Sequence, residues 1–334
     1  MFSFASGYIR NPVLHITPRI QPSEFGLLCQ YQFNNDNNNP YVLQQKLDGL
    51  FNMTRIGKNG LPISILVGLS GYIGNSDKGM LLTPQFWGAF SIVQLISAAS
   101  MVINDLFDIE VDRINNPERP LVQGSVTVSE AILFTVSMLS LVPIIGYYVL
   151  STRVEHYWWG AIGLILLYTP ILKRVFFIKN LVCATVVSST VPFVAFSVMT
   201  NPLTNLHWIT LTSKTLFMAS LYIEVLLDIT DVEGDRENGI QTLPVILGKG
   251  ASIIILAGFI SIGWVNMLID LFKNDVSIYV FTGIILSYVP FYTNLCRIWR
   301  TQCSPQCYKI IIKNSIKQTT LSLIIYFASI ALLQ

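Results

Sequence analysis

The chain has 334 residues, of which 52% are hydrophobic and 12% are charged, and its formal net charge is +2. Its mean hydropathy of +0.56 excludes two soluble domains, which the length alone would allow. The small net charge gives no reason to expect a nucleic-acid partner. We therefore predict an integral, multi-pass membrane protein in contact with membrane lipid.

The N-terminal segment differs in composition from the rest of the chain. It contains Arg10 and Arg19, no acid among its first 23 residues, and an Asn-rich run at 34–39. We predict that residues 1–45 form a disordered tail or an organelle-targeting segment. A targeting segment would fit a plastid, mitochondrial or ER membrane. Residues 46–334 are predicted to form one transmembrane domain.

Apolar stretches recur along residues 46–334, separated by breaks that hold Pro, Gly, Asn and charge. A bilayer core is crossed by about 20 apolar residues in a helix. We predict an all-α, multi-pass transmembrane helical bundle of nine helices, near 61–77, 84–104, 129–150, 155–172, 180–199, 208–228, 251–271, 276–296 and 316–333.

Basic residues are distributed unevenly over the predicted connections. With nine spans, one side holds 15 Lys and Arg residues, and the other side holds only Lys78, Arg153, Lys214 and Lys273. Connections rich in Lys and Arg stay on the cytosolic side of a membrane. The richer side, which also carries most of the acidic residues, is therefore predicted to be the cytosolic or equivalent face.

Two acidic motifs end the second and sixth predicted spans, and ten of the 19 acidic residues lie in or just beyond them. In the first, Asn104, Asp108 and Asp112 have i, i+4, i+8 spacing, and Asp105 lies beside them. In the second, Asp228, Asp231 and Asp235 are spaced similarly. Residues at this spacing share one face of a helix. Each motif is therefore predicted to be an oxygen-rich stripe at a helix end.

Oxygen ligands of this kind suit Mg²⁺, which keeps phosphate and water in its coordination shell. Two facing stripes could hold Mg²⁺ ions that neutralise a diphosphate. Two alternatives remain open. The acids could be solvated residues that cap helices, or they could mark the ion pathway of a transporter.

Basic residues on the same face fit a phosphate ligand, because Arg makes bidentate phosphate contacts and Lys supplies a point charge. Lys173 and Arg174, which follow Tyr168-Thr169-Pro170, are favoured for the diphosphate. The complete set is Arg113, Arg119, Lys173, Arg174 and Arg236.

These motifs resemble those of the UbiA superfamily of intramembrane prenyltransferases. The family's NDxxDxxxD signature is matched by Asn104 to Asp112, and the tract continues to Gly124. Its second signature is matched by Asp228 to Arg236, followed by Gly239-Ile-Gln-Thr242-Leu243-Pro244. The resemblance covers roughly residues 50–334 and includes the nine spans.

The resemblance implies a helical bundle around a central cavity, with Mg²⁺ as cofactor and a prenyl diphosphate donor. It implies that the carbon–oxygen bond to diphosphate ionises and that a small lipophilic or aromatic acceptor attacks the allylic cation. The metal ligands implied are Asn104, Asp108, Asp112, Asp231 and Asp235, with Asp105 as a further catalytic acid. The substrate-binding residues implied are Asn104, Arg113, Arg119, Lys173, Arg174, Asp228 and Arg236.

The acceptor is left open by the sequence. The tracts around the two motifs resemble archaeal digeranylgeranylglyceryl phosphate synthases, and the second also resembles homogentisate prenyltransferases and chlorophyll synthases. Leu227 and Tyr222-Ile223 depart from these branches. A terpene cyclase that makes a hydrocarbon or alcohol without an acceptor, and a membrane transporter, are the alternative functions.

Overall fold

The structure is a computed structural model that describes residues 40–168, 177–200, 205–274, 276–301 and 305–333. Two compact units are distinguished, residues 1–43 and 44–334, and the second contains the helical bundle. The described residues form helices and no strands, as predicted. The helices are α2 (Pro40–Thr54), α3 (Ile56–Asn75), α4 (Pro84–Phe107), α5 (Ile109–Asn115), α6 (Pro120–Gln123), α7 (Val128–Val149), α8 (Glu155–Tyr168), α9 (Ile178–Val198), α10 (Leu206–Thr230), α11 (Val232–Glu237), α12 (Leu243–Lys273), α13 (Ile278–Arg300) and α14 (Pro305–Ala331), with 3₁₀ turns η1 (Lys78–Leu82) and η2 (Thr152–Val154).

Every predicted span overlaps one helix, and residues 169–172 of the fourth predicted span lie outside the described residues. Among the described residues, six helices are long and apolar enough to cross a membrane: α4, α7, α9, α10, α12 and α13. The other three predicted spans overlap α3, α8 and α14, which are not among these six. The protein is thus a multi-pass membrane protein, and the number nine stays a prediction.

Local sequence signals set several helix ends. Pro84 begins α4, and the Thr83 hydroxyl accepts a hydrogen bond from the Phe86 N–H. Thr127 and Glu130 form a reciprocal capping box at the start of α7. Such caps satisfy backbone N–H groups that a helix end leaves unpaired.

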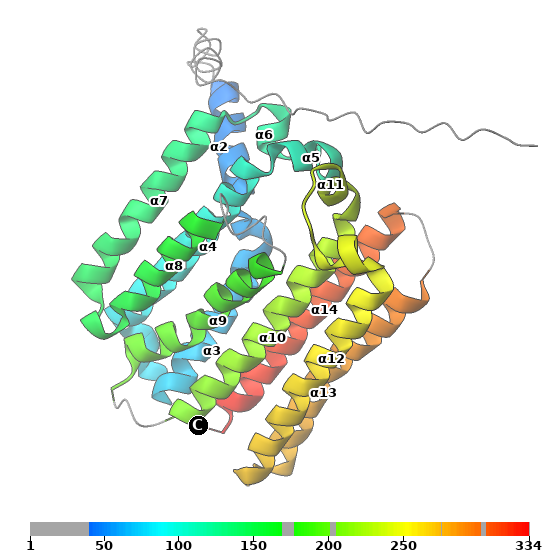
Figure 1. Ribbon diagram of the computed structural model, residues 1–334. Coiled ribbons are helices and arrows are strands. Elements are labelled where there is room, and N and C mark those ends of the chain that lie inside the picture. The colour runs from blue at the N-terminus through cyan, green and yellow to red at the C-terminus, as the bar shows by residue number, and fades with distance from the viewer. Residues whose placement is uncertain (1–39, 169–176, 201–204, 275, 302–304, 334) are drawn as a thin grey trace, which may run out of the picture. The chain divides into compact units, whose positions relative to one another are not determined.

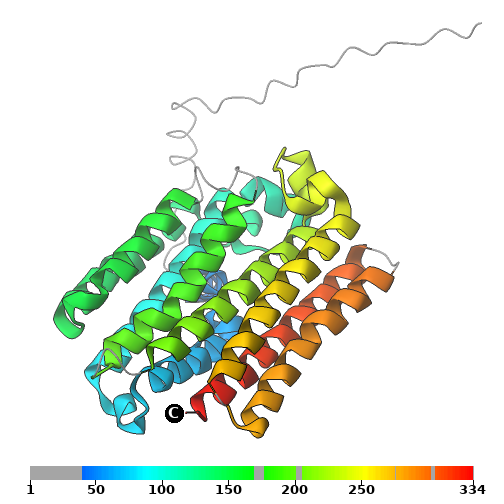
Figure 2. The same cartoon turned by 60° about the horizontal axis from the view of Figure 1, so that its bottom comes forward.

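Three apolar clusters hold the long helices together. The largest joins α10, α12, α13 and α14, the second joins α3, α4, α8 and α9, and the third joins α2, α4 and α7. Figures 1 and 2 both show α9 and α10 side by side. Large apolar side chains such as Leu133, Ile254 and Phe272 are exposed, as expected of a surface that faces lipid.

Candidate functional site

Each acidic motif bends at an aspartate that follows a long helix. Asp108 separates α4 from α5 with φ −100° and ψ 10°, and Asp231 separates α10 from α11 with φ −105° and ψ 8°. The predicted continuous stripes are therefore each divided between two helices. Each aspartate takes the position that precedes a short helix, and neither side chain makes a capping hydrogen bond there.

The two short helices pack against each other at one end of the bundle (Figure 1). Gly234 of α11 permits the contact, because a Cβ atom there would lie 2.4 Å from Asn115 Nδ2 of α5. Asn115 Nδ2 donates a long hydrogen bond of 3.5 Å to the Asp231 carbonyl. Lys309 of α14 donates to the Asn115 carbonyl at 2.9 Å. These contacts bring the two motifs together on one side of the protein.

A polar cavity of about 260 Å³ lies between the motifs. The first motif contributes Asn104, Asp108 and Asp112 to its wall, and the second contributes Asp228, Asp231 and Asp235. Glu224 is a further acid, and the cationic lining residues are Arg55, Arg119 and Lys179. Six acids thus face three cations, which gives the described wall a formal excess of negative charge.

Asp105 is the centre of an ion-pair network behind the first motif. Its side chain is 4% exposed. Its Oδ1 atom accepts from Arg55 Nη2 at 2.8 Å and also from Arg119 Nη1. Arg119 Nε lies 3.3 Å from Asp112 Oδ2. Burial, together with the positive charge of Arg55, lowers the pKa of Arg119 to about 10. Asp105 is absent from the cavity wall, and it holds two arginines that belong to that wall.

The second motif carries a matching cation. Lys179 Nζ lies 2.5 Å from Asp228 Oδ1, and Asn180 Nδ2 donates to Asp228 Oδ2 at 2.9 Å. Asp228 therefore fixes Lys179 at the cavity wall. Burial raises the pKa of Asp231 above the usual value for aspartate. A bound cation would offset the cost of a charged carboxylate at this position.

Some predicted substrate-binding residues lie elsewhere. The Arg113 side chain is 61% exposed and pairs with Glu110 at 2.9 Å, and Arg236 is exposed. Neither lines the polar cavity. Lys173 and Arg174 lie outside the described residues. The structure instead brings in Arg55, Lys179 and Glu224, which sequence reasoning did not select.

No three Asp, Glu, His or Cys side chains among the described residues lie close enough together to form a metal site on their own. Mg²⁺ is commonly held by one or two carboxylates together with substrate phosphates and water. The oxygen donors of this cavity fit that mode of binding, in which the ligand completes the coordination shell.

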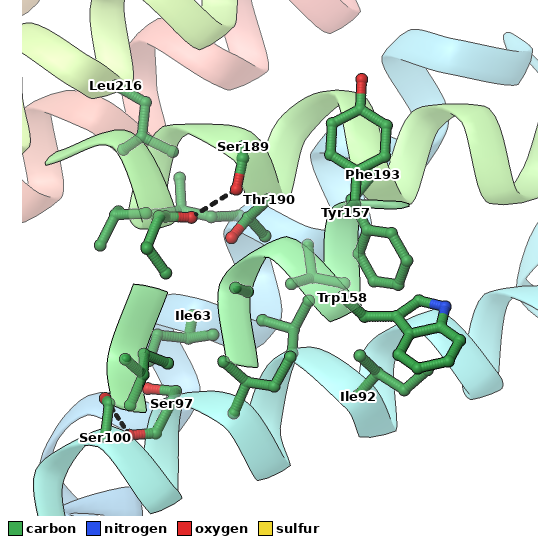
Figure 3. A pocket seen from close by; sticks show the side chains of 18 of the residues that line it. Ile63, Ile92, Ser97, Ser100, Tyr157, Trp158, Ser189, Thr190, Phe193 and Leu216 are labelled. Carbon is green, nitrogen blue, oxygen red and sulfur yellow. Dashed lines mark hydrogen bonds between the residues drawn. The ribbon is translucent and has the colours of Figure 1, made fainter. Parts of the chain in front are cut away.

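An apolar cavity of about 170 Å³ adjoins the polar one. Both are lined by Ser100, Met101, Ile165, Val186 and Val187. Figure 3 shows Ser97 and Ser100 on one side of this cavity and Tyr157, Trp158 and Phe193 on the other. A ligand with a charged head and an apolar body can therefore occupy both cavities at once.

The sequence is similar to a family model and to curated relatives. Residues 62–310 match the model of the UbiA prenyltransferase family. The digeranylgeranylglyceryl phosphate synthase of Natronomonas pharaonis is 27% identical over 220 residues, which cover 65% of this chain and 75% of the relative. The enzyme of the same name from Pyrococcus abyssi is 29% identical over 197 residues, covering 58% of this chain and 69% of the relative.

Solved structures share the fold. A digeranylgeranylglyceryl phosphate synthase structure superposes with a TM-score of 0.62 at 22% identity, covering 85% of this chain and 99% of the other. A UbiA homolog from Archaeoglobus fulgidus bound to GPP and Mg²⁺ gives 0.59 at 20% identity, covering 86% and 99%. The family match spans most of the chain and confirms the resemblance seen in the two motifs: the protein belongs to the UbiA prenyltransferase family.

Proposed function

We propose that this membrane prenyltransferase binds a prenyl diphosphate with its head in the polar cavity and its tail in the apolar cavity. The observation that carries the proposal is the meeting of the two acidic motifs in one cavity. Six acids and three cations line it. A diphosphate would add negative charge to a wall that already has an excess, so divalent cations must accompany it.

The proposed metal ligands are Asn104, Asp108, Asp112, Asp231 and Asp235. When bound, Mg²⁺ would stabilise the negative charge that develops on the departing diphosphate. Arg119 and Lys179 line the same cavity and are placed to contact diphosphate oxygens. Asp228 positions Lys179, and Asp105 positions Arg55 and Arg119. Lys173 and Arg174 remain proposed diphosphate contacts.

One face of α4 supports the placement of the tail. Asp108, Asn104, Ser100, Ile96 and Ile92 follow at intervals of four residues and line the two cavities in turn. At 1.5 Å per residue this row is about 24 Å long. It changes from acidic to apolar along its length, as a prenyl diphosphate does. Apolar walls also exclude water, which would otherwise hydrolyse an allylic cation.

The acceptor is proposed to be a small lipophilic or aromatic molecule. The names of the similar archaeal enzymes make a prenylated glyceryl phosphate the first acceptor to test. Attack by an acceptor hydroxyl would form the new carbon–oxygen bond as diphosphate leaves. The hydroxyl proton would then pass to a base or to water.

The test uses purified protein with geranylgeranyl diphosphate, Mg²⁺ and a panel of acceptors. Diphosphate release and product masses are measured. Asp108→Ala and Asp231→Ala should each lower turnover by about 10²-fold or more, because each removes stabilisation of the leaving group. Products formed without any acceptor would instead identify a cyclase, and substrate that crosses proteoliposomes unchanged would identify a transporter.

Matched controls come from the same motifs. Glu110 and Glu233 are exposed acids that do not line the cavity. Glu110→Ala and Glu233→Ala should retain nearly full turnover. Equal loss of activity in all four variants would show that net charge at this face matters, and not the cavity acids.

A further inference from the structure

A third cavity lies at the end of the bundle opposite to α5 and α11. Its volume is about 600 Å³, and its wall is built from α9, α10, α12 and α13. It includes several residues between 211 and 218 in the first half of α10 and several between 263 and 273 in the last turns of α12. This cavity shares no lining residue with the polar cavity between the motifs, and its α10 residues lie well before Thr230, where α10 ends, so the two cavities are separate.

Charged residues line this cavity both near the helix ends and within the membrane-spanning helices. Lys214 lies eight residues into α10, which places its Cα about 12 Å along the helix axis. Gly263 of α12 lies opposite Met218, since a Cβ atom on Gly263 would be 3.3 Å from Met218 Cγ. This register places Asn266 near the level of Lys214 and leaves Asp270 and Lys273 closer to the membrane face.

These charges are not paired with one another. Lys214, Asp270 and Lys273 all line the cavity. Among the described residues, no ion pair joins Asp270 to either lysine. A charged side chain inside a membrane span is costly unless an opposite charge or water compensates it. Only four cations are predicted on this whole face of the membrane, and two of them meet in this cavity.

We propose that this cavity binds the headgroup of a membrane phospholipid that carries a phosphodiester beside a primary ammonium group, such as phosphoethanolamine. The phosphate lies between Lys214 and Lys273, and the ammonium group donates to Asp270. Asn266 and Ser213 supply further hydrogen-bonding groups. The phosphodiester has two free oxygens that can accept from the two lysines, and the ammonium group can donate to the one carboxylate; such charge-assisted hydrogen bonds are the strong ones.

The test is native mass spectrometry of the full-length protein with phosphatidylethanolamine or phosphatidylcholine added at equal concentration. Phosphatidylcholine has the same phosphodiester but no N–H donor, so the wild-type protein should retain about tenfold less of it. The Lys214→Gln/Lys273→Gln variant should lose retention of phosphatidylethanolamine. Asp270→Asn should bring the two lipids to equal retention while some binding persists.

The control variant is Lys78→Gln/Arg153→Gln, which removes the other two cations of this face and should bind as the wild type does. Asp108→Ala should also bind lipid normally, so a failure of the proposed catalytic roles would not affect this result. Equal retention of both lipids by the wild type would overturn the proposal. So would binding of inorganic phosphate at this cavity without retention of either lipid.

Discussion

Asp105 shows how one residue of a motif differs in role from its neighbours. It lies next to Asn104 in the sequence, yet it pairs with Arg55 and Arg119 and does not line the polar cavity. Sequence reasoning grouped it with the catalytic acids because it shares the motif. The contacts support a positioning role instead, in which Asp105 holds two arginines at the cavity wall.

Asp105→Asn tests this role. The amide keeps the shape of the side chain but removes the carboxylate that pairs with Arg55, and it leaves Arg119 with only Asp112 as a partner. We expect a loss of about 2 kcal/mol in stability, since breaking a buried ion pair is costly. Donor affinity should fall as well, because Arg119 is then held at the cavity wall by Asp112 alone. Thermal unfolding in detergent and the KM for prenyl diphosphate measure the two effects.

The concentration of Mg²⁺ needed for half-maximal activity separates positioning from ligation. This concentration should be the same for Asp105→Asn as for the wild type. A variant that lacks a metal ligand should need a higher Mg²⁺ concentration. Glu110→Gln is the matched control, because the Glu110–Arg113 pair is exposed and such pairs contribute at most about 1 kcal/mol. A strong shift in the Mg²⁺ requirement of Asp105→Asn would restore Asp105 to the set of metal ligands.

Among single residues, spacing along the chain predicted the residues of the cavity wall better than residue type did. The i, i+4 rule selected Asn104, Asp108 and Asp112, and all three line the cavity. The same rule applied one turn earlier would have selected Glu224, four residues before Asp228. No such signal exists for Arg55, which reaches the site from the start of α3, 50 residues before Asp105. Its place depends on how α3 and α4 pack, which the sequence does not state.

At the scale of elements, close helix contacts position the site. Helix α3 begins beside Arg55, and α9 carries Lys179 near its start. The two helices approach closely at Gly74, where a Cβ atom would lie 2.8 Å from Ala195 Cα and 2.9 Å from its carbonyl oxygen. Small residues let membrane helices pack backbone to backbone. The relative placement of Arg55 and Lys179 therefore depends in part on this glycine.

Gly74→Ala should force α3 and α9 apart, because backbone atoms of Ala195 cannot rotate away as a side chain can. We expect a destabilisation of about 1–3 kcal/mol, as in other overpacked interiors. Gly68→Ala in the same helix is the control, since nothing lies within 4 Å of its Cβ position. It should be neutral or slightly stabilising, because Ala favours helix over Gly. Equal thermal midpoints for the two variants would contradict the close-contact argument.

At the scale of the whole molecule, hydropathy predicted the class of fold, and the number of spans stays a prediction. All nine predicted segments overlap helices, yet only six of the described helices meet the length and hydropathy needed to cross a membrane. Helix α14 illustrates the reason. It has 27 residues, but its first turns carry Lys309, Lys313 and Lys317, so composition alone does not mark where a span would begin.

The uneven distribution of Lys and Arg predicts the orientation of the bundle. The acidic motifs and 15 cations are predicted on the cytosolic or equivalent face, and η1 with Lys78 follows α3 at the other end.

The test introduces Gln123→Cys or Lys78→Cys, both at exposed positions, into a chain without other cysteines. In sealed vesicles with the cytosolic face outward, a membrane-impermeant maleimide should label Gln123→Cys at once. Lys78→Cys should react only after detergent is added, because α4 lies between the two positions and crosses the membrane. The reverse pattern would show that the charge bias does not set the topology, and labelling of both variants from one side would show that α4 does not cross the membrane.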